Sequence, residues 1–86
     1  ALAEAEAAFR TELATRSAVR DPIAWAVVQI GLARIYEARA DLTGSNGEIP
    51  DAAFALSEAL DVFAERGLRS LSDIALTALD RLKARR

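Results

Sequence analysis

The side chains that could take part in chemistry are of few kinds. The 86-residue chain has 13 Asp and Glu and 11 Lys and Arg, but no Cys and no His. Disulfides, thiolate metal sites, cysteine nucleophiles and triads built on imidazole are therefore excluded. The carboxylates lie in no ExxH metal pattern, glycine-rich phosphate loop or GxSxG nucleophile elbow. We expect a non-enzymatic protein without cofactor or metal ion.

The charges are spread along the chain. The formal net charge is −2 and no basic block occurs, so the sequence has no electrostatic footprint for nucleic acid or an anionic membrane. No apolar run approaches the ~20 residues of a transmembrane helix. We therefore expect a cytoplasmic protein that binds neither nucleic acid nor membrane.

The elements that position these charges are predicted to be helices. Apolar residues at helical spacing predict a first amphipathic helix over residues 2–17. Asp21 followed by Pro22 is typical of a helix start, with an N-cap acceptor and a first-turn proline. The second helix is predicted to continue to about residue 40.

Turn residues then mark a third and a fourth helix. Residues 43–47 (TGSNG) form the one obvious loop, in which Asn and Gly tolerate positive φ, and the third helix is predicted to start near residue 49. Gly67 fits a left-handed helix stop. Ser70 or Ser72 can cap a fourth helix that runs to about residue 84. The short links predict an all-α fold of four antiparallel helices in one domain, residues 1–86.

An internal repeat becomes visible when the sequence is shifted by 47 residues. Apolar positions then fall on apolar positions, and Arg34 falls on Arg81. The aligned pairs include Leu2 with Ile49, Phe9 with Leu56, Leu13 with Leu60, Val27 with Ile74, and Leu32 with Leu79. A repeat at this period is typical of a solenoid, whereas a chance match between alanine-rich helices is the alternative.

The repeat resembles the tetratricopeptide (TPR) repeat in its longer bacterial variety, P-x-x-W-A-x-x-Q-x-x-L-G-x-A-L followed by a loop and A-x-x-x-F/Y-x-x-A-L. The matching residues are Pro22, Trp25, Ala26, Gln29, Leu32 and Tyr36, then Ala52, Leu56, Ala59 and Leu60. The chain departs from the pattern at Ala33, where Gly is favoured, and in the fourth helix at Ser72 and Leu76, as a capping helix would. A different helical stack also fits so weak a consensus.

The resemblance implies two helix-turn-helix repeats of an α-solenoid, with a concave groove lined by the first helix of each pair. The implied peptide- or partner-binding residues are Val27, Ile30, Arg34, Glu37, Ile74, Thr77, Arg81 and Arg85. Arg34 and Arg81 share a repeat position, so the two guanidinium groups are expected to hold a carboxylate of a partner peptide. The alternative is that both are solvated charges that pair with neighbours such as Glu37.

Two sets of packing contacts are expected. Small residues should meet large ones across the second and third helices, with Leu32, Ala33 and Tyr36 against Ala52, Leu56 and Ala59. Trp25, with its line of apolar residues on the second helix, is expected to pack on the first helix around Phe9 and Leu13.

Two functional interpretations follow. The first is a protein-protein interaction module within a larger regulatory or scaffold protein, since the chain begins without an initiating Met. Ten of its 11 basic residues are arginine, which with the many alanines suggests a bacterial source. The second is a self-association module that forms a homodimer through apolar repeat ends.

Overall fold

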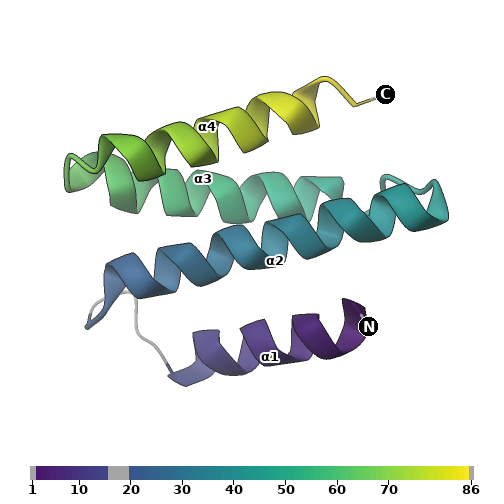
Figure 1. The fold of residues 1–86 in the computed structure, drawn as a ribbon, viewed down its shortest axis with the longest axis horizontal. Helices are drawn as coiled ribbons and strands as arrows, with labels where there is room; N and C mark the ends of the chain where they lie inside the picture. Colours follow the sequence, from purple (N-terminus) through teal and green to yellow (C-terminus); the bar gives the residue numbers. More distant parts are fainter. Residues whose placement is uncertain (1, 16–19, 86) are drawn as a thin grey trace.

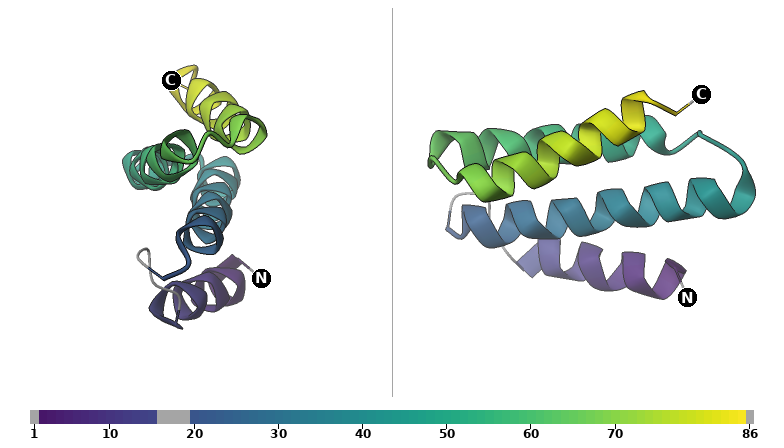
Figure 2. Two further views of the ribbon diagram at one scale, coloured as in Figure 1. Left: turned by 90° about the vertical axis from the view of Figure 1, so that its left-hand side faces the viewer. Right: turned by 45° about the horizontal axis from the view of Figure 1, so that its top comes forward.

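The protein is an all-α stack of four helices. The computed structural model describes residues 2–15 and 20–85, and no β-strand occurs within them. The helices α1 (Leu2–Thr15), α2 (Pro22–Thr43), α3 (Ile49–Glu65) and α4 (Arg69–Lys83) follow one another in chain order, and each packs on the next (Figure 1). Seen end-on, α3 lies to one side of the line that joins α2 and α4 (Figure 2). The predicted helical class is confirmed.

The observed first residues of the helices agree with the predicted ones better than the observed last residues do. α1 and α3 begin at the predicted residues, while the predicted end of the first helix at Ser17 lies outside the described residues. α2 continues three residues beyond Ala40, until Gly44 adopts a φ of 73° and donates its N–H to the Ala40 carbonyl at 2.8 Å. Asp21 occupies the N-cap of α2, but no side-chain cap hydrogen bond forms there.

The turn between α3 and α4 corrects the prediction that Ser70 or Ser72 caps the fourth helix. Gly67 has a φ of 67° and donates to the Ala64 carbonyl, while Leu68 donates to the Phe63 carbonyl at 2.9 Å. These two bonds form a Schellman motif, in which Leu68 also packs near Phe63. α4 begins directly afterwards at Arg69, so both serines lie inside the helix.

The core lies mainly between α2, α3 and α4. Its larger buried cluster contains Leu32, Ala33, Tyr36, Ala52, Ala55, Leu56, Ala78 and Leu82. This confirms the predicted packing of α2 on α3, except that Ala59 belongs to a second cluster with Ala26 and Phe63. Trp25 packs against that second cluster, whereas Phe9 and Leu13 pack against the larger one.

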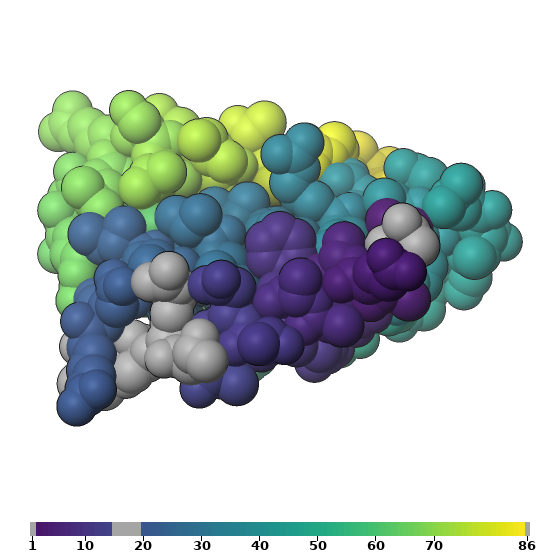
Figure 3. Space-filling view, turned by 60° about the horizontal axis from the view of Figure 1, so that its bottom comes forward, coloured from purple at the N-terminus to yellow at the C-terminus, as the bar shows by residue number. Residues whose placement is uncertain are grey.

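α1 lies across the surface of α2 (Figure 3). Phe9 rests on the backbone of Gly31, where an added β-carbon would lie only 2.5 Å from Phe9 Cε1. Glu6 pairs with Arg39, which also contacts Glu48 at 2.7 Å just before α3. Arg39 therefore connects α1 to the start of α3.

No helix in the part of the chain that the structure describes is long and apolar enough to cross a membrane.

Candidate functional site

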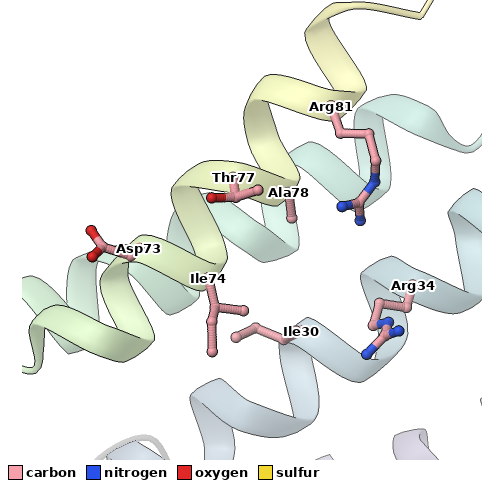
Figure 4. Close-up of a pocket in the computed structure, with 7 residues that line it drawn as sticks. All are labelled: Ile30, Arg34, Asp73, Ile74, Thr77, Ala78 and Arg81. Carbon is pink, nitrogen blue, oxygen red and sulfur yellow. The ribbon is translucent and has the colours of Figure 1, made fainter.

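A groove between α2 and α4 brings together five of the eight predicted binding residues. Its volume is about 370 Å³. The five are Ile30, Arg34, Ile74, Thr77 and Arg81, and Asp73 and Ala78 complete the lining (Figure 4). The α4 residues recur at intervals of three and four, so they share one face of the helix. The groove is therefore built from two helices that lie far apart in sequence.

The groove has an apolar middle and a cationic end. Ile30 and Ile74 point toward each other across it, and the side chain of Ile74 is 52% exposed (Figure 4). Arg34 on α2 and Arg81 on α4 lie at the same end of the groove, while Asp73 points away at the other end (Figure 4). An occupant would meet apolar surface and positive charge side by side.

Arg81 already has a carboxylate partner within the chain. Its Nε and Nη2 donate to the two carboxylate oxygens of Glu37 at 2.7 and 2.8 Å, and the hydrogen bonds raise the pKa of Arg81. The Glu37 side chain is largely buried. Glu37 is therefore the counter-ion of Arg81, which is the neighbour pairing anticipated as the alternative for the two arginines.

Arg34 differs from Arg81 although the 47-residue shift aligns the two. It is exposed and forms no hydrogen bond or ion pair with any of residues 2–15 and 20–85. A guanidinium presents five donors that can bind a carboxylate in bidentate fashion. Arg34 is the groove cation that is open to a ligand.

The remaining predicted residues lie outside the groove lining. Val27 is 47% exposed on α2, one turn before Ile30 on the same face. Arg85 donates to Asp41 at 2.7 Å and to Asn46 at 3.1 and 3.3 Å, which fixes the end of the described chain to the α2–α3 connection. Val27 is an exposed apolar residue of α2 outside the groove lining, whereas Arg85 has a structural contact.

Sequence reasoning missed two residues of the lining, Asp73 and Ala78. Both could have been found from α4 alone, because Asp73 precedes Thr77 by four residues and Ala78 follows Ile74 by four. Among the residues that the structure describes, no three Asp or Glu side chains gather where they could hold a metal ion.

Comparison of the chain with protein-family models, with curated proteins and with solved structures found no match.

Proposed function

We propose that the chain is a non-catalytic protein-protein interaction module whose α2–α4 groove binds a segment of a partner protein. The observation that carries this proposal is the open guanidinium of Arg34 at the end of an apolar groove, beside an arginine that is neutralised by Glu37. A charged group without a partner at the edge of apolar surface favours a ligand that supplies both kinds of contact.

The chemistry of the groove specifies the partner segment. Ile30 and Ile74 can pack against an apolar side chain of the segment. Arg34 can pair with a carboxylate from Asp, Glu or a free C-terminus that lies one helical turn or two residues from that apolar side chain. Arg81 contributes less, since a ligand would have to compete with its bidentate contact to Glu37.

The proposal includes a TPR-like arrangement in which the helices form antiparallel pairs of an α-solenoid. Two observations support it. The α2–α3 and α3–α4 connections lie at opposite ends of the molecule (Figure 1). The 47-residue shift relates the Phe9–Gly31 contact to Leu56 and Ala78, which share the larger core cluster. Such a module would serve a larger bacterial, cytoplasmic regulatory or scaffold protein.

Self-association through repeat ends receives less support from α4. Four α2 residues buried toward α3 are Ala26, Gln29, Ala33 and Tyr36. Their counterparts 47 positions later are Asp73, Leu76, Asp80 and Lys83, and all four are exposed. The outer face of α4 is therefore mostly charged and suits solvent better than a second copy.

A peptide-library screen tests the proposed function. Wild type should select peptides with an apolar residue next to an acidic residue or a free C-terminus. Arg34→Ala should weaken the binding of these peptides by about ten- to hundredfold, since a charge-assisted hydrogen-bonded pair contributes roughly 1.5–3 kcal/mol. Arg69→Ala, an exposed arginine outside the groove, is the matched control.

The outcome against the proposal is also defined. If Arg34→Ala keeps every peptide with unchanged affinity, or if binding maps by NMR to residues away from Ile30 and Ile74, the groove is not the binding site.

A further inference from the structure

A second hollow lies between α1 and α3, separate from the α2–α4 groove. Its volume is about 360 Å³, and none of its lining residues belongs to the groove. Leu13, Leu32 and Tyr36 contribute apolar or aromatic surface to it, and Phe54 forms its α3 side.

Phe54 is the unusual residue of this surface. Its side chain is 66% exposed although α3 otherwise buries its large apolar residues or covers them in part. A phenylalanine ring offers a flat face of negative electrostatic potential, which attracts cations. The hollow therefore has an aromatic wall that no residue of the described chain covers fully.

Carboxylates flank this ring. Asp51 and Glu58 lie three residues before and four residues after Phe54, so they share its face of α3. Glu58 accepts a hydrogen bond from the Gln29 amide at 3.0 Å and has no cationic partner among residues 2–15 and 20–85. Within the same residues, the Asp51 side chain makes no hydrogen bond or ion pair. Two negative charges of the hollow are thus not neutralised there.

Arg10, which lines the hollow, and Arg39, which pairs with the lining residue Glu48, are already engaged. Arg10 donates to Glu6 at 2.9 Å and to the Tyr36 hydroxyl at 2.6 Å, and Arg39 neutralises Glu48 at 2.7 Å. The sequence on the α3 side of the hollow adds no positive charge. Residues 40–65 contain no Lys or Arg and six carboxylates, namely Asp41, Glu48, Asp51, Glu58, Asp61 and Glu65.

We propose that this hollow docks a basic segment of a partner protein, in which an arginine stacks on Phe54 and pairs with Asp51. Charge complementarity and the exposed ring select this occupant. Arginine fits better than lysine because its planar guanidinium can stack on an aromatic ring while it donates to a carboxylate. An apolar residue next to that arginine would pack against Leu13. This docking proposal is independent of the proposed function of the α2–α4 groove, since the hollow lies on other helix faces and carries the opposite charge.

A defined peptide tests the inference. The probe is a fluorescent, blocked hexapeptide that alternates leucine and arginine, and the control probe alternates leucine and glutamate. Binding is measured by anisotropy, and amide shift changes in a ¹⁵N-labelled sample locate the site. The variants are Phe54→Ala and Asp51→Asn. Their matched controls are Leu42→Ala, an exposed apolar residue elsewhere, and Asp61→Asn, a carboxylate of α3 outside the hollow.

Shift changes should centre on residues 51–58, and the arginine probe should bind more tightly than the glutamate probe. Phe54→Ala should weaken binding about two- to fivefold, the range expected for an exposed cation–π contact. Asp51→Asn should weaken it by a similar factor and reduce its salt dependence.

Several results would overturn the inference. Equal binding of both probes would do so, as would unchanged affinity in Phe54→Ala together with Asp51→Asn. Shift changes confined to Ile30 and Ile74 would assign the peptide to the groove instead. Self-association that Phe54→Ala abolishes would make a second copy the occupant and contradict a separate basic partner. Since all four substitutions are at exposed positions, circular dichroism should be unchanged in each.

Discussion

The contact between Phe9 and Gly31 determines how closely α1 approaches α2, and replacing Gly31 with alanine tests it. The new β-carbon would lie 2.5 and 2.6 Å from Phe9 Cε1 and Cζ, whereas carbon atoms pack at about 3.5–4.0 Å. The ring would have to move away from α2 by about 1 Å or more. Because the ring belongs to α1, this movement would loosen the docking of the whole helix.

Two opposing effects set the size of the change. Alanine stabilises the interior of a helix relative to glycine by about 1 kcal/mol, and overpacking costs roughly 1–3 kcal/mol. Gly31→Ala should therefore change the free energy of unfolding by between about zero and −2 kcal/mol. In a Phe9→Ala background the clash is absent, so the same substitution should stabilise the protein by about 1 kcal/mol.

The assay is a double-mutant cycle from urea unfolding of wild type, both single variants and the double variant. The expected coupling energy between positions 9 and 31 is roughly 1–3 kcal/mol. Amide hydrogen exchange should show faster opening of α1 in Gly31→Ala than in wild type. If Gly31→Ala stabilises both backgrounds equally, the close approach of Phe9 does not restrict α2 and the reasoning is refuted.

Further predictions concern acid, the core and the turns. Hydrogen bonds from Arg39 and Arg10 lower the pKa of Glu6. The stability that these bonds add is therefore present above the usual carboxyl range and is lost as the pH falls through the lowered pKa. Glu6→Gln should reduce this loss of stability at acid pH in pH-dependent unfolding, and an unchanged pH dependence would contradict the prediction. Phe63→Ala, at a fully buried site, should cost about 3–5 kcal/mol in urea unfolding, and a loss below about 1 kcal/mol would argue against its central place in the core. Gly67→Ala should cost about 1–2 kcal/mol because of its positive φ, whereas Gly47→Ala lacks that constraint and should be close to neutral in thermal unfolding; equal losses would refute the comparison.

The positions of the helices could be predicted because local signals specify them. Apolar spacing identified all four, and Gly67 ended α3 as expected. The serine cap of α4 was wrong because the Schellman motif satisfies the backbone and restarts the helix at Arg69. The sequence does not specify the neighbours of Trp25. Periodicity shows which face of a helix is apolar, but α2 has helices on two sides and the spacing does not say which one Trp25 meets.

Local sequence signals also account for only part of the groove. The resemblance implied Ile30, Ile74 and Thr77 as binding residues, and these three line the α2–α4 groove. The resemblance could not distinguish Arg34 from Arg81, which the 47-residue shift aligns. Glu37 lies three residues after Arg34 but reaches across to Arg81, 44 residues away. Such a choice depends on side-chain reach between helices, which the linear sequence does not encode locally.

Three exposed charged residues of α4, Asp73, Asp80 and Lys83, stand where the 47-residue shift places α2 residues that are buried toward α3. In an engineered tandem, the substitutions Asp73→Ala, Asp80→Ala and Lys83→Tyr would give α4 three of the residues that α2 buries against α3. The altered helix would then present a stripe on which a further unit can be built. In the proposed repeat arrangement these three charges, together with Leu76 at the counterpart position of Gln29, are what distinguish α4 from α2 as a surface for a further helix.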